Sequence, residues 1–395
     1  MDFSFSEEQN QLRDAVRRYV SQEYSFEERR KILKGAGTSE TIWNGLAGLG
    51  LMGVPVPEAH GGYATKDAGT GVDMLVVMEE LGRGLVAEPY FASAVMGTAF
   101  VKFGGSDAQK AALLPALADG SLKLACALSE KQSRHELNNV ALMGAATTNG
   151  FSLNGLKTVV LHGAQADKLI VSARTAGGTR DLSGITVFIV DQSATGVSLR
   201  DYRTIDGMRA ADVTFTHVAV GKDAVLGKAG AGYGLIERAA EIGIAALCAE
   251  AVGCMSMINE QTIEYIKTRK QFGVPIGKFQ VLQHRAAEMF MELEQARSLA
   301  YLAAVKIDSA DANERKRAVH AAKVRAGRAV KFVGQAAIQM HGGMGMTDEL
   351  AVSHYFKRAT MIDYTLGDVD HHLAAFAALP STGNVKTKEA LPLAA

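Results

Sequence analysis

The sequence predicts an α+β fold in which a helical N-terminal domain and a C-terminal four-helix bundle flank a middle domain of antiparallel β-strands. Apolar residues recur at helical spacing through the first third of the chain, and short β-branched runs divided by turn signals follow. Long helical periodicity then resumes. We place the domains at residues 1–121, 122–232 and 233–379, followed by a tail at 380–395.

The N-terminal domain is expected to be wholly helical. Ser6 precedes Gln9 by three residues, the spacing of a capping box, and predicts a helix over residues 5–24. Glycine and proline punctuation, as at residues 54–57, separates the later elements. Further helices are predicted at residues 39–49, 70–84, 90–104 and 106–119.

The middle domain carries short runs typical of strands. Turn pairs such as Asn154-Gly155 and Asp206-Gly207 divide these runs, and this pattern indicates antiparallel hairpins rather than βαβ units. The predicted strands include residues 158–161, 168–172, 185–190, 196–199 and 213–218.

The last third of the chain predicts three long helices, at residues 233–267, 280–306 and 312–341. Gly342-Gly343 suits the end of the third helix. The most apolar stretch, residues 242–258, is interrupted by Glu250, so it predicts a buried helix and not a membrane span.

Composition excludes several classes of function. The chain has 42 Lys and Arg against 42 Asp and Glu, which argues against a nucleic-acid or polybasic membrane surface. Its three cysteines are too scattered for a disulfide framework or a zinc site, so no metal is predicted. The N-terminus lacks the pattern of a signal peptide, and we expect a reducing, cytoplasmic location. No glycine fingerprint or P-loop opens a helix after a strand.

Two segments of the C-terminal part are specific. The first, residues 265–280, reads YIKTRKQFGVPIGKFQ, and the second, residues 335–345, reads QAAIQMHGGMG. With the α, β, α order of domains they closely resemble the acyl-CoA dehydrogenase family of FAD enzymes. The resemblance covers residues 1 to about 378 and includes the loop signatures at 49–53 and 57–62.

The resemblance implies which residues bind FAD. Arg269 would pair with the pyrophosphate of an FAD held by an adjacent subunit, because a guanidinium bonds phosphate oxygens in pairs. Paired glycines would let the backbone approach the ADP portion without interference from a Cβ atom. The implied cofactor-binding residues are Arg269, Gln271, Phe272, Phe279, Gln280, Gln339, Gly342 and Gly343.

The family reaction also needs a carboxylate base beside the flavin ring, and here the sequence departs from the family. One usual position of the base corresponds to Gly367 and the other to Gly243. Asp368 is a weak candidate for a displaced base, and Glu241 a weaker one. We favour a helix-capping role for the cluster Asp368, Asp370, His371 and His372 over a metal site, and packed or surface roles for His284 and His341.

The flavin-ring half is altered elsewhere too. Residues 158–162 (TVVLH) replace the usual Trp-Ile-Thr strand, and residues 129–136 (SEKQSRHE) replace a Gly-rich loop. The adenosine-half motifs remain. The pattern is most similar to small subunits of two-component enzymes of the pimeloyl-CoA dehydrogenase type. It predicts a subunit that completes the FAD site of a catalytic partner in a heterotetramer.

Two alternatives stay open. One is a self-sufficient homotetrameric dehydrogenase that uses Asp368 as its base, and the other is a scaffold subunit without flavin. The family resemblance further implies an acyl-CoA substrate and an electron-transfer flavoprotein as acceptor.

Overall fold

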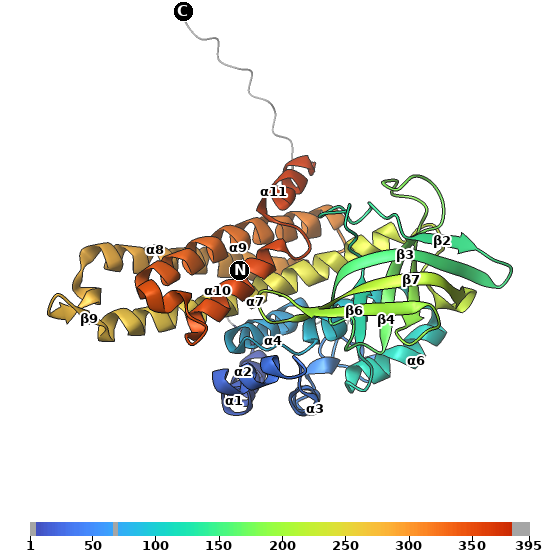
Figure 1. The fold of residues 1–395 in the computed structure, drawn as a ribbon. Coiled ribbons are helices and arrows are strands. Elements are labelled where there is room, and N and C mark those ends of the chain that lie inside the picture. The colour runs from blue at the N-terminus through green and yellow to red at the C-terminus, as the bar shows by residue number, and fades with distance from the viewer. Residues whose placement is uncertain (1–4, 66–69, 381–395) are drawn as a thin grey trace, which may run out of the picture.

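The computed structural model describes residues 5–65 and 70–380. Figure 1 shows the long helices of the C-terminal bundle extending away from the β domain, with the N-terminal helices packed below both. The α+β prediction, with its helical, β and helical order, is confirmed. The predicted boundary at 121/122 falls between α6 and β1, and that at 232/233 falls at the start of α7. Of the predicted tail, residues 381–395 lie outside the described residues.

The N-terminal domain is helical as predicted, and the capping box of Ser6 and Gln9 is present. The helix predicted at 90–104 begins as a π-helix, and a short helix at Phe26–Lys34, capped by Ser25, was not predicted. The elements are α1 (Glu7–Glu23), α2 (Phe26–Lys34), α3 (Glu40–Gly48), η1 (Leu51–Gly53), η2 (Glu58–His60), α4 (Thr70–Gly84), η3 (Phe91–Gly97), α5 (Thr98–Gly104) and α6 (Asp107–Ala118).

The middle domain is one twisted sheet in the order β6-β7-β3-β2-β4-β5-β8, with β1 also paired to β4. The prediction of antiparallel strands is wrong for β1 and for β2, which both pair with β4 in parallel. Forty residues separate β1 from β4, a connection long enough for parallel pairing. The strands are β1 (Leu124–Ala127), β2 (Met143–Ala146), β3 (Gly150–Leu161), β4 (Lys168–Arg174), β5 (Ile185–Asp191), β6 (Val197–Arg203), β7 (Arg209–Gly221) and β8 (Val225–Leu226).

The C-terminal bundle is built on α7, which passes the length and hydropathy test for a membrane span. However, 89% of its most apolar window is buried within the structure, as the interruption by Glu250 predicted for this core helix. The elements are α7 (Tyr233–Thr268), β9 (Lys270–Gln271), β10 (Val274–Pro275), η5 (Ile276–Lys278), α8 (Gln280–Lys306), α9 (Ala312–His341), η6 (Gly342–Met346), α10 (Ala351–Tyr364) and α11 (Val369–Ala378).

A buried charge network joins the three domains. Arg358 of α10 donates to both oxygens of Glu250 in α7, at 2.5 and 2.7 Å, and to Asp206 of the β domain at 2.9 Å. Arg29 of α2 donates to the Asp206 carbonyl at 3.0 Å and contacts His354 Nδ1 at 3.1 Å. Since these charges are buried together, the network fixes how the β domain sits against the bundle.

Candidate active site

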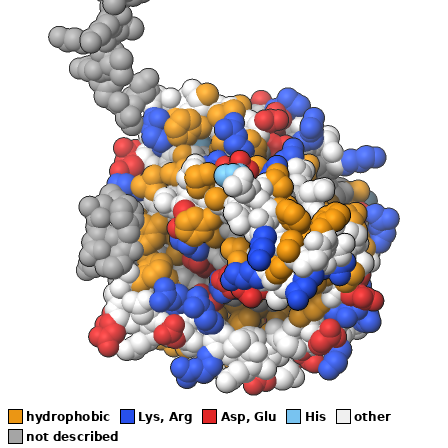
Figure 2. All heavy atoms as spheres, turned by 90° about the vertical axis from the view of Figure 1, so that its left-hand side faces the viewer, with side chains coloured by type: hydrophobic (Ala, Val, Ile, Leu, Met, Phe, Trp, Pro, Cys, Tyr) orange, Lys and Arg blue, Asp and Glu red, His pale blue; other side chains and the backbone are white. Residues whose placement is uncertain are grey.

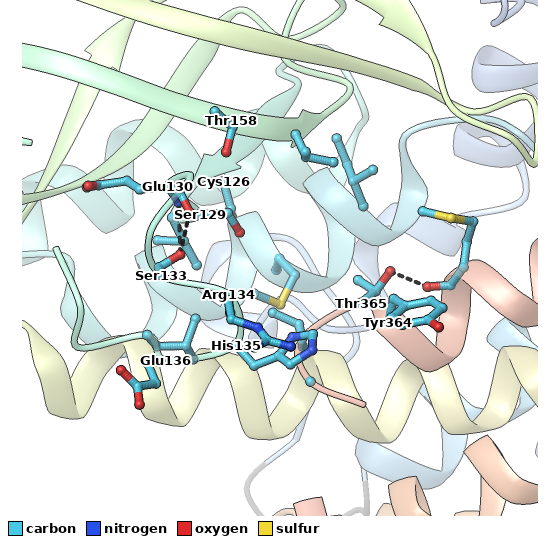
Figure 3. Close-up of a pocket in the computed structure, with 18 of the residues that line it drawn as sticks. Cys126, Ser129, Glu130, Ser133, Arg134, His135, Glu136, Thr158, Tyr364 and Thr365 are labelled. Carbon is cyan, nitrogen blue, oxygen red and sulfur yellow. Dashed lines mark hydrogen bonds between the residues drawn. The ribbon is translucent and has the colours of Figure 1, made fainter. Parts of the chain in front are cut away.

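A cavity of about 330 Å³ lies where the β domain meets the bundle (Figure 3). Its wall combines η3, β1, the loop after β1, β3 and the segment that follows α10. Gly367 and both altered segments, the loop at 129–136 and the strand at 158–161, contribute to this wall. The departures from the family pattern therefore meet in one place, as the resemblance implied for the flavin-ring half.

Both usual positions of the carboxylate base are closed by packing. A Cβ atom on Gly367 would lie 2.6 Å from atoms of His371 and His372, and the backbone there has a φ of +111°. A Cβ atom on Gly243 would lie 2.4 Å from the sulfur of Met96 and 2.9 Å from Leu366. No side chain fits at either place without rearrangement, so neighbouring side chains have taken up the space of the base.

A buried ion pair anchors the loop that follows β1. Lys157 Nζ lies 2.6 Å from Glu130 Oε1 and 2.9 Å from Ser172 Oγ. Glu130 also accepts from the backbone N–H groups of Ala141 and Leu142. Burial lowers the pKa of Lys157 to about 8, and although burial alone would raise the pKa of Glu130, the Lys157 ammonium holds it below its ordinary value. The pair thus ties both ends of the loop to β3.

Unfavourable backbone geometry occurs on the β3 side of the cavity. Val159 lines the cavity with a φ of +53°, at an irregularity where β3 shifts register against β7. A left-handed conformation is rare for a β-branched residue and is typically retained at functional sites.

Lys323 of α9 holds the opposite wall. Its Nζ donates to the carbonyls of Ile362, Asp363 and Thr365, which end α10. Burial lowers the pKa of Lys323 to about 8. This lysine fixes the segment that carries Tyr364 and Gly367 into the cavity.

Asp368 lies next to the cavity but has structural partners. One oxygen caps α11 by accepting from the His371 backbone N–H at 2.9 Å, and the other lies 3.3 Å from Nε2 of His135. The His371 N–H bond holds the pKa of Asp368 below its ordinary value. Helix capping was the role that the sequence favoured for this residue.

The remaining residues considered as a base or a metal ligand either have structural partners or lie on the surface. Glu241 pairs with Arg238 at 3.1 Å and with Arg315 at 2.8 Å. His341 is buried, with Nδ1 2.8 Å from the Ala337 carbonyl, and His284 is exposed on α8. Among the described residues no group of three or more His, Cys, Asp or Glu side chains could hold a metal ion.

The predicted cofactor-binding residues lie together at the far end of the bundle. Tyr265 stacks on His341 with ring centroids 4.3 Å apart and joins the end of α7 to the end of α9. Phe272 is 91% exposed and Phe279 37% exposed. Figure 2 views this end of the molecule and shows apolar side chains spread among lysines and arginines. The other six, all likewise exposed, are Arg269, Gln271, Gln280, Gln339, Gly342 and Gly343.

The chemistry of this end suits the ADP half of FAD. A Cβ atom on Gly342 or Gly343 would meet nothing within 4 Å, so a ligand can approach the backbone there. Arg269 has no acidic partner within 4.0 Å among the described residues, which leaves its guanidinium free for a pyrophosphate. The residues fit the group that the resemblance implied.

A buried histidine, His372, and a half-buried one, His320, lie beside the cavity and are expected to make the fold acid-sensitive. His320 and His372 lie with their Nδ1 atoms 2.8 Å apart, and burial lowers their pKa values to about 4 and about 2. Below pH 6.5 the unfolded chain takes up protons at both histidines while the folded chain does not, so stability falls with pH by up to about 1.4 kcal/mol per unit for each.

We expect the urea midpoint to fall between pH 6.5 and pH 4, and to fall less in His372→Asn. Exposed His284→Asn serves as the control and should follow the wild type. If the urea midpoint changed with pH to the same extent in all three proteins, the His320–His372 pair would not be the source of the acid sensitivity.

The sequence missed His135 and Lys157. His135 stands in a loop without a family motif, and its contact with Asp368 joins residues 233 positions apart, so no spacing rule could find it. The Lys157–Glu130 pair is likewise a long-range contact between β3 and the loop after β1.

Comparison with known proteins agrees with this arrangement. Residues 6–121, 125–218 and 230–378 match the N-terminal, middle and C-terminal domains of acyl-CoA dehydrogenase. The 3-(aryl)acrylate reductase of Clostridium sporogenes is 30% identical over 91% of this chain and 94% of its own. The glutaryl-coenzyme A dehydrogenase glutaryl-CoA complex has a TM-score of 0.88 at 26% identity, covering 95% of this chain and 96% of that one.

The Tcur3481-Tcur3483 steroid ACAD has a TM-score of 0.84 at 28% identity, covering 94% of this chain and 97% of that one. Domain order, cavity and relatives lead to the same conclusion. The chain belongs to the acyl-CoA dehydrogenase family, the FAD-dependent oxidoreductases that act on acyl-CoA thioesters.

Proposed function

We propose that this chain is one subunit of an acyl-CoA dehydrogenase made of two unlike chains, and that its bundle end supplies the ADP half of the FAD site in the partner. The observation that carries the proposal is the distance between the two half-sites. Gly243 packs against Met96 and Leu366 of the cavity wall, and Arg269 caps the far end of α7; they are 26 residues apart, or roughly 39 Å at helical rise. One FAD molecule cannot reach both, and this supports a cofactor shared between two chains.

An unlike partner is favoured over a second copy because of the base. A carboxylate must take the α-proton of the thioester, and both positions where the family carries one are filled here by Met96, Leu366, His371 and His372. The partner chain would therefore carry the carboxylate. The two-chain name of the Tcur3481-Tcur3483 relative is in line with this reading.

Each group at the bundle end has a definable task. Arg269 would bind the pyrophosphate in charge-assisted hydrogen bonds, and the exposed ring of Phe272 would lie against the adenosine portion. Gly342 and Gly343 would present backbone to the ADP. FAD, when bound, accepts the hydride that leaves the β-carbon of the acyl group.

The homotetrameric alternative with Asp368 as base receives less support, because both carboxylate oxygens of Asp368 already have partners. A scaffold without flavin receives less support because the free guanidinium and the open glycines suit a dinucleotide. We further propose a cytoplasmic location, a heterotetrameric assembly and an electron-transfer flavoprotein as acceptor, on the sequence grounds given above.

Replacing Arg269 by alanine should weaken FAD retention in the assembled complex without unfolding the chain. Loss of a charge-assisted hydrogen bond costs about 1.5–3 kcal/mol, roughly ten- to hundredfold in flavin affinity. The measurement is FAD content after dialysis of the co-expressed chains. Lys267→Ala, two residues away and paired with Glu264, is the matched control and should retain FAD.

Gly343→Val gives a second, independent test. Since a Cβ atom there meets nothing within 4 Å, the fold tolerates the side chain, and any loss of FAD arises from the ligand or the partner. Wild-type FAD content in both Arg269→Ala and Gly343→Val would refute the proposed half-site.

A further inference from the structure

We propose that Tyr265, through its stack on His341, is a positioning residue for FAD. It holds the turn that carries Arg269 at a fixed distance from the turn that carries Gly342 and Gly343, so that both turns meet one ADP group. The proposal deepens the proposed function and rests on it, because these two turns are the half-site assigned above. It adds that the half-site is preorganised by two side chains that are not among its predicted FAD contacts.

The two parts of the half-site come from different helices. Arg269 follows the end of α7 and Gly342 follows the end of α9, so the two residues are 73 positions apart in the chain. A ligand that bonds to both turns loses affinity if the turns must first be ordered, because that ordering costs free energy. Whatever fixes the spacing of the turns in the free protein therefore contributes to FAD affinity.

Each turn folds back on its own helix. The Ile276 N–H donates to the Arg269 carbonyl at 2.8 Å, and a Cβ atom on Gly277 would lie 3.0 Å from a carbonyl of α7. A Cβ atom on Gly345 would lie 2.8 Å from a carbonyl of α9. The shape of each turn is thus set locally, and only a contact between the turns can set their spacing.

Tyr265 and His341 provide such a contact. Their rings stack with centroids 4.3 Å apart and ring planes 30° apart. Tyr265 Oη also donates to the His341 carbonyl at 3.4 Å, which is long for such a bond, so the ring stack supplies most of the contact. That carbonyl belongs to the peptide group that leads into Gly342. Among the described residues this is the one hydrogen bond that joins residues 264–283 to residues 337–347.

Both partners of the stack are anchored beside the half-site. The Tyr265 carbonyl accepts from the Arg269 N–H at 2.8 Å, so a shift of Tyr265 moves Arg269 with it. His341 is buried, and its Nδ1 lies 2.8 Å from the Ala337 carbonyl, which can only accept. Burial lowers the pKa of His341, so its ring is neutral at neutral pH. The imidazole is a fixed, neutral surface for the ring of Tyr265.

The turns themselves are exposed, so the stack matters more for the cofactor than for the fold. Residues 267–273 and 342–344 all lie at the surface. Gly273 and Gly342 have φ values of +78° and +58°, and glycine backbones change conformation at little cost. Without the stack the spacing of the two turns would vary, while the core of the bundle beneath them stays packed.

Replacing Tyr265 by leucine removes the ring and keeps an apolar side chain. We expect the assembled complex to bind FAD roughly two- to tenfold more weakly, which is the contribution of one aromatic pair. Tyr265→Phe keeps the stack and should bind FAD as the wild type does. The measurement is titration of the flavin-depleted complex with FAD, followed by the quenching of flavin fluorescence.

Tyr301→Leu is the matched control for a loss of packing alone. The Tyr301 ring contacts that of Phe5, with centroids 5.9 Å apart. It lies 21 residues along α8 from Gln280 at the bundle end, or roughly 32 Å at helical rise. Urea midpoints of both leucine variants report the lost stability. FAD affinity should fall in Tyr265→Leu and not in Tyr301→Leu, even where the two lose the same stability.

A double mutant tests whether Tyr265 acts through the Arg269 turn. Tyr265→Leu should weaken FAD binding less in the Arg269→Ala background than in the wild type, because the guanidinium that the stack positions is then absent. Losses that add in full would mean that Tyr265 does not position Arg269.

Wild-type FAD affinity in Tyr265→Leu, together with weakened binding in Arg269→Ala, would overturn the positioning role and leave the half-site intact. An equal loss in Tyr265→Phe and Tyr265→Leu, or an equally large loss in Tyr301→Leu, would also overturn it. Wild-type affinity in both Arg269→Ala and Tyr265→Leu would instead refute the half-site on which the role depends.

Discussion

Replacing Arg358 by methionine is expected to destabilise the folded protein by about 3–5 kcal/mol. The substitution removes the one cation among the described residues that bonds both Glu250 and Asp206, and it leaves two carboxylates buried without this partner. Breaking a buried ion pair by removing one partner costs this much because the remaining charge cannot be hydrated. The measurement is the urea midpoint of the purified protein compared with that of the wild type.

Arg200→Met provides the control. Arg200 lies 2.6 Å from Asp212, but its side chain is 79% exposed, and such pairs contribute about 1 kcal/mol or less. A change in Arg358→Met no larger than that in Arg200→Met would mean that the network does not hold the domains together.

Gly367→Glu places a carboxylate at one of the two positions where the family carries its base. This substitution is expected to give no gain in acyl-CoA-dependent dye reduction and to destabilise the chain. The backbone φ of +111° strains any side chain, at a cost of about 1–3 kcal/mol. The contacts at 2.6 Å with His371 and His372 force repacking that costs about 1–3 kcal/mol more. Movement of these histidines would also disturb the cap that Asp368 provides for α11.

Gly227→Glu separates the two costs. Gly227 has a φ of +75° but a Cβ atom there meets nothing within 4 Å, so only the backbone cost applies. The thermal midpoint should fall further in Gly367→Glu than in Gly227→Glu. If Gly367→Glu reduced the dye faster than the wild type, packing at this position would not be what prevents a carboxylate from acting as the base.

The sequence alone determined the architecture and the bundle end. Helix α1 follows from a capping box within four residues, and the long helices follow from apolar residues three and four positions apart. These signals lie within short segments of the chain, so they can be recognised without tertiary information. The segments 265–280 and 335–345 are contiguous motifs, and for that reason they could be matched to a family before any geometry was known.

Tertiary structure decided the character of the cavity. Gly243 appears in the sequence as a missing base, but only packing places Met96 and Leu366 in the space of its side chain. The parallel pairing of β1 with β4 and the contact of His135 with Asp368 join segments far apart in the chain. The contact of His135 with Asp368 also depends on how the β domain is set against the bundle. The buried charges of Arg358, Glu250 and Asp206 fix that placement, and no local periodicity reports it.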